Sequence, residues 1–215
     1  MPTKAAFPKI ALSLAALALV ATCAVLVIFH YRLSYAEVAA YASSLQKYRG
    51  EKDLFFRVSS RSPLVHSELF RGLAYYPAQP ALRFKLRLLP LPDTATQWLA
   101  TNLGTPLPYR QAGWVQIPKT PPAKGVSPAI ILYPPAEPKR WLLAFKDETS
   151  GEETSPLGRY LEVEPVGQHH VWVDFNLAYH PYCVYNPALA CPEPPTINNL
   201  PFPIKAGERL AEALP

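Results

Sequence analysis

Three hydrophobicity patterns follow one another along the chain. Residues 10–29 form an uncharged apolar run, IALSLAALALVATCAVLVIF. Residues 38–48 then carry apolar side chains at helical spacing, and beyond Pro63 the spacing changes to every second residue. These patterns predict a membrane-spanning helix, an amphipathic helix and a β-rich domain, in that order.

The apolar run has the length of a membrane span. Its 20 residues are about the number that crosses a bilayer's hydrocarbon as a helix. A cleaved signal peptide is the alternative, but its apolar part is usually shorter and ends in a small-residue cleavage site, whereas residues 25–29 here are VLVIF. We therefore expect a tail over residues 1–9 and a retained anchor, in contact with lipid, over residues 10–29.

The orientation of this anchor is less clearly encoded. Lys4 and Lys9 precede the run and Arg32 follows it, so the positive-inside rule barely decides. A short basic tail before one span and one large domain is typical of a signal anchor. We expect a single-pass protein of a bacterial cytoplasmic (inner) membrane with its C-terminal domain on the periplasmic side.

The amphipathic helix is expected over residues 34–58. Ser34 and Glu37 have the spacing of a capping box, in which each side chain satisfies exposed backbone donors at a helix start. Pro63 then stops the helical pattern. Its apolar stripe is expected to dock on its own domain or on a partner helix.

Short alternating segments dominate residues 60–215. They are RFKLRLL, GWVQI, AIILY, RWLLAF, RYLEVEPV and HVWVDFN, each bounded by Pro, Gly or polar residues. This predicts a mainly β (α+β) domain, with an antiparallel sheet curled into an open barrel or a sandwich. A proline-rich segment, residues 191–208, is expected to cover a sheet edge.

The charge argues against a nucleic-acid partner. Setting aside Lys4, Lys9 and Arg32, which flank the apolar run, leaves 21 − 3 = 18 basic residues against 16 acidic ones, so the rest of the chain is only +2. Nucleic-acid binding depends on clustered positive charge. We expect a module attached to a membrane protein complex rather than a nucleic-acid binder.

The familiar enzyme motifs are also missing from the sequence. It contains no G-x-S-x-G, no H-E-x-x-H, no phosphate-binding glycine loop and no dinucleotide fingerprint. We therefore expect a binding or accessory module rather than an enzyme, and predict no cofactor.

Cys183 and Cys191 are separated by seven residues rich in turn formers, so the chain can bring the two sulfurs together. A disulfide closing so short a loop stabilises a domain by about 2–3 kcal/mol, and it persists in an oxidising compartment. Zinc is the alternative, with His180 and either Asp174 or His170 completing four ligands. The looser C-x7-C spacing favours the disulfide, and we predict no metal site.

Asp147, Arg159, Asp174 and Asn176 form a second candidate site. If the strands around them pair, their side chains meet near one rim of the sheet. An arginine between carboxylates acts either as a structural clasp or as an anion-binding fork, and we favour the clasp.

A catalytic alternative uses part of the same set. Asp174 would act as general base, with His180 as acid or Cys183 as nucleophile, in a hydrolase-like small-molecule enzyme whose site includes Arg159. Cys183 cannot be both nucleophile and disulfide partner in one resting state.

Two further groups of residues have a structural and a functional interpretation. The aromatic residues either cover the sheet edge or line a ligand cleft. They are Tyr179, Tyr182, Tyr185 and Phe202. The acidic residues lack the alternating spacing of a calcium loop and predict a solvated hairpin turn. They are Asp147, Glu148, Glu152 and Glu153.

Three longer stretches are similar to a known family. They are FFRVSSRSPLVHSELFRGLAYYP, FKDETSGEETSPLGRYLEVE and DFNLAYHPYCVYNPALACPEPPTINNLPFPIKAGE. They resemble the bacterial and archaeal family called domain of unknown function 1684, over nearly everything after the anchor. The resemblance implies an architecture and a site, but no reaction.

The resemblance also implies which residues matter most. Outside the long C-terminal run they are Ser62-Pro63-Leu64, Gly72-Leu73, Asp147, Thr149, Gly151, Thr154, Gly158 and Arg159. Two positions depart from the family pattern: Ser155 stands where an aromatic residue is common, and His180 where an asparagine is common. The resemblance therefore gives no support to a role that requires a histidine at position 180.

Overall fold

The computed structural model describes residues 7–91, 96–119 and 124–211, and within its first helix the side chains at positions 19–23, 25 and from 35 onward. The chain divides after Ser44 into two compact units. The first consists of the N-terminal part of helix α1, Phe7–Val58. The second contains the last turns of α1 and a β-rich domain.

Helix α1 ends where the sequence predicts but begins earlier. It runs without interruption through Ser34, so the expected capping box does not start a helix. Residues 9–49 contain neither Gly nor Pro, and Pro8 lies in the first turn, where proline is tolerated. At the other end, the Ser62 hydroxyl donates to the Phe56 carbonyl over 2.6 Å, which satisfies one of the open acceptors of the last turn.

The predicted membrane span, residues 10–29, falls mostly on positions whose side chains lie outside the described ones. Among the residues that the structure does describe, no helix combines the length and the apolar character needed to span a membrane. The anchor and the membrane location remain predictions from the sequence.

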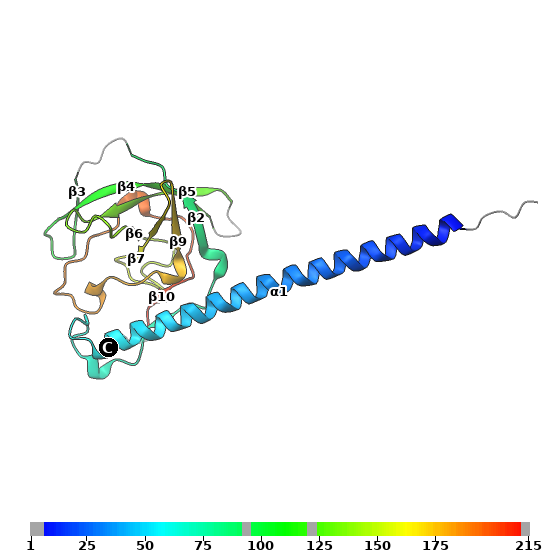
Figure 1. Ribbon diagram of the computed structural model, residues 1–215. Helices are drawn as coiled ribbons and strands as arrows, with labels where there is room; N and C mark the ends of the chain where they lie inside the picture. The colour runs from blue at the N-terminus through cyan, green and yellow to red at the C-terminus, as the bar shows by residue number, and fades with distance from the viewer. Residues whose placement is uncertain (1–6, 92–95, 120–123, 212–215) are drawn as a thin grey trace, which may run out of the picture. The chain divides into compact units, whose positions relative to one another are not determined.

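The domain consists of antiparallel sheets, as predicted (Figure 1). A five-stranded sheet has the order β3-β4-β5-β6-β7 and a three-stranded sheet the order β2-β9-β8, while β1 pairs with β10. The strands are β1 Ala74–Tyr75, β2 Arg83–Arg87, β3 Gln97–Leu99, β4 Leu107–Pro118, β5 Val126–Tyr133, β6 Leu142–Phe145, β7 Arg159–Glu162, β8 Glu164–Val166, β9 His170–Asp174 and β10 Glu208–Arg209. Short 3-10 helices are η1 Ser67–Leu69, η2 Pro80–Leu82, η3 Phe175–Leu177, η4 Tyr182–Val184 and η5 Thr196–Asn198.

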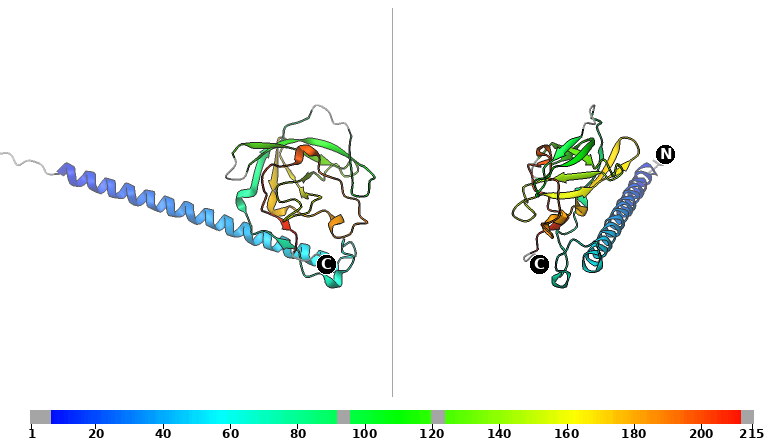
Figure 2. Two further views of the ribbon diagram at one scale, coloured as in Figure 1. Left: turned by 180° about the vertical axis from the view of Figure 1, so that it is seen from behind. Right: turned by 90° about the vertical axis from the view of Figure 1, so that its left-hand side faces the viewer.

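The sheets curve around one core without closing into a barrel (Figure 2). Leu89, just beyond β2, exchanges backbone hydrogen bonds of 2.9 Å with Trp114 of β4, which links the two larger sheets. The main cluster of buried side chains takes residues from both, including Val115, Leu143 and Val173. Leu45 and Phe56, in the last turns of α1, are also buried, at 3% and 0% exposed, but lie outside this cluster.

Candidate functional site

Asp147 and Arg159 form a buried ion pair at the end of the β6–β7 hairpin. Phe145 of β6 lies opposite Arg159 of β7, so Asp147, two residues further on, is within reach. Arg159 Nη2 donates to Asp147 Oδ2 over 3.0 Å, and both side chains are 0% exposed. Gly158, at φ +84°, permits this turn because a Cβ there would lie 2.5 Å from the Phe145 carbonyl oxygen.

The same two side chains hold the C-terminal segment. Arg159 also donates to the carbonyls of Ile204, Ala206 and Glu208. Asp147 accepts from the Ile204 amide over 2.6 Å and from the Thr149 hydroxyl over 2.7 Å. Burial lowers the pKa of Arg159 and the Asp147 carboxylate opposes that effect; an arginine stays protonated in either case. The pair has the contacts of a clasp.

Asp174 and Asn176 belong to a different junction. Asp174 ends β9 opposite Arg83 of β2, whose Nε lies 3.4 Å from Asp174 Oδ2. Its other oxygen caps η3 by accepting from the Asn176 amide over 3.1 Å. Asn176 in turn pairs with both backbone groups of Gln79. Asp174 therefore does not join the Asp147–Arg159 pair as the sequence interpretation expected, because β9 lies in the other sheet.

His180 is buried and neutral. Its Nε2 accepts a hydrogen bond from the Ser155 amide over 3.3 Å, and its side chain is 1% exposed. Burial lowers the pKa of His180 to about 3, with help from the positive charges of Arg159 and Lys52. The imidazole acts here as a hydrogen-bond acceptor in the interior.

Cys183 and Cys191 form the predicted disulfide, with Cα atoms 6.0 Å apart. A disulfide leaves neither sulfur as the thiolate that zinc requires or as a resting nucleophile. Within the described part of the chain, no three His, Cys, Asp or Glu side chains converge in a way that would hold a metal ion.

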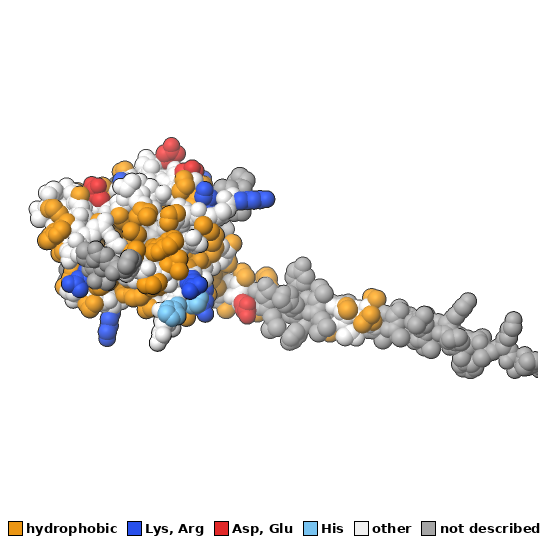
Figure 3. Space-filling model, turned by 90° about the horizontal axis from the view of Figure 1, so that it is seen from above, with side chains coloured by type: hydrophobic (Ala, Val, Ile, Leu, Met, Phe, Trp, Pro, Cys, Tyr) orange, Lys and Arg blue, Asp and Glu red, His pale blue; other side chains and the backbone are white. Residues whose placement is uncertain are grey.

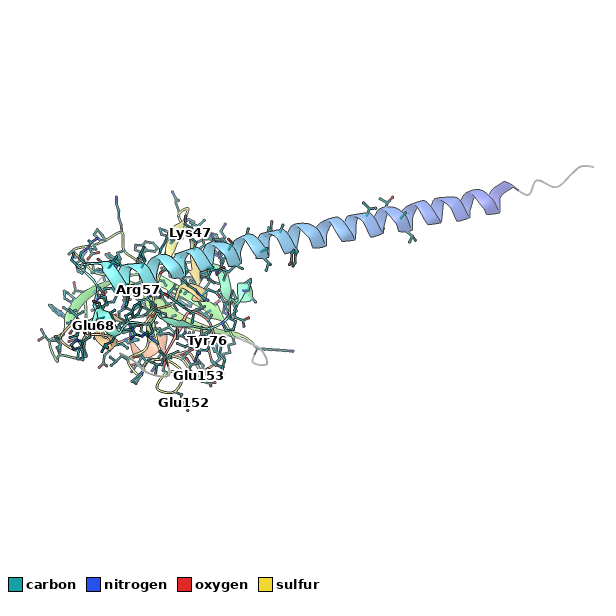
Figure 4. The ribbon with its side chains drawn as sticks, turned by 90° about the horizontal axis from the view of Figure 1, so that it is seen from below. Lys47, Arg57, Glu68, Tyr76, Glu152 and Glu153 are labelled. Atoms are coloured by element: carbon teal, nitrogen blue, oxygen red, sulfur yellow. A yellow bond between two sulfur atoms is a disulfide. The ribbon has the colours of Figure 1, made fainter. Side chains whose placement is uncertain are left out.

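The acidic loop is only partly solvated. Glu148 and Glu152 are exposed, as expected of a hairpin turn, whereas Asp147 is buried in the clasp. Glu153 accepts from the Tyr76 hydroxyl over 3.1 Å (Figure 4) and pairs with Lys205 over 2.6 Å. The loop is thus fastened to the chain's C-terminal segment.

Sequence reasoning missed the role of Glu208. This carboxylate is 1% exposed, and its Oε1 lies 2.6 Å from Nζ of Lys52 on α1. Its Oε2 accepts from the His180 amide over 2.8 Å and from the Tyr185 hydroxyl over 3.2 Å. Gly207 makes room for this approach, since a Cβ there would lie 2.5 Å from the Ala178 carbonyl oxygen. The only signal for Glu208 in the sequence was its position in Ala206-Gly207-Glu208, which ends the C-terminal stretch that resembles the family. Nothing in the sequence marks Lys52 as its partner.

A groove of about 740 Å³ opens between the last turns of α1 and the β domain. Its aromatic lining is Tyr48, Phe55, Tyr109, Trp141, Tyr160, Tyr179 and Tyr182, and its charged lining is Glu51, Lys52, Lys139, Arg140, Glu162 and Glu164. Hydrophobic side chains are also exposed elsewhere on the domain (Figure 3), so what distinguishes this surface is that it is hollowed into a groove. Its volume lies within the range of small-molecule sites, about 300–1,000 Å³.

The groove contains some of the predicted binding residues and not others. Tyr179 and Tyr182 line it. Tyr185 instead packs edge-on against Phe56, with ring centroids 5.0 Å apart, and Phe202 is buried in the core. Arg159 and His180 are outside the lining. The sequence did not predict three other lining residues, Trp141, Tyr109 and Arg140, because only the tertiary packing of the strands brings them to the groove.

Ion pairs hold some of the charged side chains around the groove, among them Arg140 and Lys52. Arg140 Nε lies 3.0 Å from Glu162 Oε1, which also accepts from the Tyr179 hydroxyl over 3.4 Å. The ammonium of Lys52 lies 4.3 Å from the centre of the Tyr179 ring, at cation–π distance. Lys52 of α1 therefore contacts Tyr179 of the β domain in the groove lining, and its ammonium also pairs with Glu208, which lies outside the lining.

Comparison with known proteins identifies relatives without a known activity. The family described as "Protein of unknown function (DUF1684)" matches residues 68–209. The solution NMR structure of an uncharacterized protein from Haloarcula marismortui is similar, with a TM-score of 0.63 and 27% identity, covering 81% of this chain and 96% of that one. No curated protein matches the sequence.

Proposed function

Because this chain belongs to the family described as "Protein of unknown function (DUF1684)", we propose its function from its own site, as a binding or accessory module that takes a ligand in the aromatic groove. The observation behind the proposal is the groove itself, with rings from α1 and from the β domain around one hollow. Aromatic side chains supply large contact area, and their polar ends orient a ligand.

The module is further proposed to be a single-pass protein of a bacterial cytoplasmic membrane, attached to a membrane protein complex. Support for the anchor is the uncharged apolar run at residues 10–29. Support for an outer location of the domain is the Cys183–Cys191 disulfide, since such bonds persist in oxidising compartments. A reporter fused after Pro215 tests this: a signal confined to the cell interior contradicts it.

The hydrolase-like alternative around Asp174, Arg159 and His180 has less support. Arg159 and His180 are 0% and 1% exposed, and Asp174 pairs with Arg83 in the other sheet. A substrate would need access to groups that the fold encloses.

Trp141 offers a direct test of ligand binding. The full chain is purified in detergent, and fractions of a cell extract are screened for a change in tryptophan emission. A fraction that shifts the wild-type protein and a Trp98→Phe control, but not Trp141→Phe, binds in the groove. Trp98 is a suitable control because it is 65% exposed and is not among the groove residues. If every fraction leaves Trp141 emission unchanged, the binding function is wrong.

A further inference from the structure

We propose that the ligand of this groove is a neutral oligosaccharide whose rings are β-linked with equatorial hydroxyls. This inference rests on the proposed binding function and specifies its ligand class. It follows from three properties of the groove: its flat aromatic surfaces, its balanced charges and its unused hydrogen-bonding groups.

The aromatic rings come from two sides. Tyr48 and Phe55 lie on α1, whereas Tyr109, Trp141 and Tyr182 come from the β domain. The face of an aromatic ring is electron-rich and attracts weakly positive hydrogens. In a β-linked sugar with equatorial hydroxyls, both faces of each ring present C–H groups. Such a sugar ring can stack a C–H face on these aromatic side chains and leave its hydroxyls, which lie at the edge of the sugar ring, free for polar groups.

The charges of the lining are balanced and disfavour a strongly ionic ligand. The lining has three cations, Lys52, Lys139 and Arg140, and three carboxylates, Glu51, Glu162 and Glu164. Arg140 is paired with Glu162, and Lys52 with Glu208. An anion would have to compete with Glu162 for Arg140 and with Glu208 for Lys52, and a cation would have to compete with Arg140 for Glu162. A neutral ligand leaves both ion pairs intact.

Several polar groups in the lining are unused. In the part of the chain that the structure describes, the hydroxyls of Tyr48, Tyr109 and Tyr182 make no hydrogen bond, and neither does the Glu164 carboxylate. The lining thus offers both donors and acceptors. A sugar hydroxyl can donate and accept at once, and so can use both kinds of group.

These unused donors and acceptors also distinguish a sugar from a proline-rich peptide, the other ligand that aromatic grooves commonly bind. A proline has no N–H group, so a polyproline segment offers carbonyl acceptors to the tyrosine hydroxyls but no donor to Glu164. That carboxylate would be desolvated without a partner, which costs free energy. The groove's acceptors therefore favour the sugar.

The test is isothermal titration calorimetry on the full chain in detergent. The probes are cellotetraose and chitotetraose, with α-linked maltotetraose, tetragalacturonate and decaproline as comparison ligands. We expect a β-linked neutral tetrasaccharide to bind and the other three to bind at least about tenfold more weakly, a factor that corresponds to about 1.4 kcal/mol.

Two variants place this binding in the groove. Tyr182 is 40% exposed at the groove; Tyr182→Ala is expected to weaken binding at least tenfold and Tyr182→Phe, which keeps the ring, much less. Trp98→Ala serves as the control outside the groove and is expected to bind normally. Because Tyr182 also contacts Phe56, with centroids 6.0 Å apart, thermal unfolding is measured for each variant to establish that it is folded.

The outcomes separate this inference from the function on which it rests. If only decaproline or tetragalacturonate binds, and Tyr182→Ala abolishes that binding, the sugar class is wrong and the binding module stands. If no probe binds the folded wild-type protein, the sugar proposal is overturned. The Trp141 emission screen then decides separately whether the groove binds anything.

Discussion

Lys52 of α1 lies 2.6 Å from Glu208 of β10, and this ion pair is largely buried, with side chains 13% and 2% exposed. The pair joins two residues far apart in the sequence, of which Lys52 lines the groove. Apart from Lys52, the Glu208 carboxylate accepts from the Tyr185 hydroxyl and the His180 amide, and its Oε2 lies 3.8 Å from Nδ1 of the neutral His180 imidazole. Without the ammonium, a buried carboxylate would keep only neutral donors.

Replacing Lys52 by methionine is therefore expected to destabilise the domain. Removing one partner of a buried ion pair typically costs about 3–5 kcal/mol, because the remaining charge is left uncompensated. The measurement is urea unfolding of the full chain in detergent, followed by tryptophan fluorescence.

Lys47→Met provides the matched control on the same helix (Figure 4). Lys47 pairs with Glu51 over 3.8 Å, but the two side chains are 79% and 65% exposed. Exposed pairs of this type contribute about 0–0.5 kcal/mol. Equal losses from the two substitutions would show that Lys52 does not compensate Glu208.

The Asp147–Arg159 pair predicts a second loss of stability. In Arg159→Met, Asp147 keeps its hydrogen bonds from Thr149 and Ile204 but loses its cationic partner, and three carbonyls lose the guanidinium as their donor. We expect a loss of about 3–5 kcal/mol, measured by urea unfolding.

Arg140→Met is the control for this second prediction. Arg140 also pairs with a carboxylate, Glu162, but the two side chains are 47% and 55% exposed, so its loss should cost less than about 1 kcal/mol. If the Arg140 variant proves the less stable of the two, the clasp does not hold the C-terminal segment.

Much of the β domain follows from local pattern. The alternation in RFKLR predicts the exposed and half-buried positions of β2, which alternate in the structure. The contact between Asp147 and Arg159 could also be predicted from the sequence, because both residues lie at the same end of one hairpin and the hairpin turn fixes the register of its two strands. Asp174 was misplaced because no local signal assigns β9 to the sheet with β2 rather than to the sheet with β7.

Two features of the structure were not predicted, the start of α1 for a local reason and the groove because it depends on long-range contacts. The start of α1 was misjudged since a capping-box spacing at Ser34 does not interrupt a chain whose preceding residues already favour a helix. The groove requires Tyr48 and Phe55 of α1 to face Trp141 and Tyr109. Neither helical nor strand periodicity specifies which helix face lies against which strand ends.

The Cys183–Cys191 disulfide predicts a redox-dependent stability. It closes a short loop, so reduction is expected to lower the free energy of unfolding by about 2–3 kcal/mol. The double variant Cys183→Ser/Cys191→Ser should match the reduced wild-type protein and should not respond to reductant. Thiol titration under denaturing conditions should find one thiol, that of Cys23, before reduction and three afterwards; three before reduction would exclude the bond.

His180 predicts how stability depends on pH. Burial lowers its pKa to about 3 in the folded domain, while an unfolded chain has a histidine pKa near 6.5. Between these values the unfolded state binds the extra proton, so His180 stabilises the fold fully above about pH 6.5 and progressively less as the pH falls toward 3.

His180→Asn removes the titrating group while keeping an acceptor for the Ser155 amide, and should therefore flatten the dependence of the urea midpoint on pH from 7 to 4. His66→Asn, at a side chain that is 63% exposed, should leave the slope unchanged. If the His180 variant loses stability with acid as steeply as the wild type, other groups carry the effect, and the imidazole is not held neutral by its surroundings.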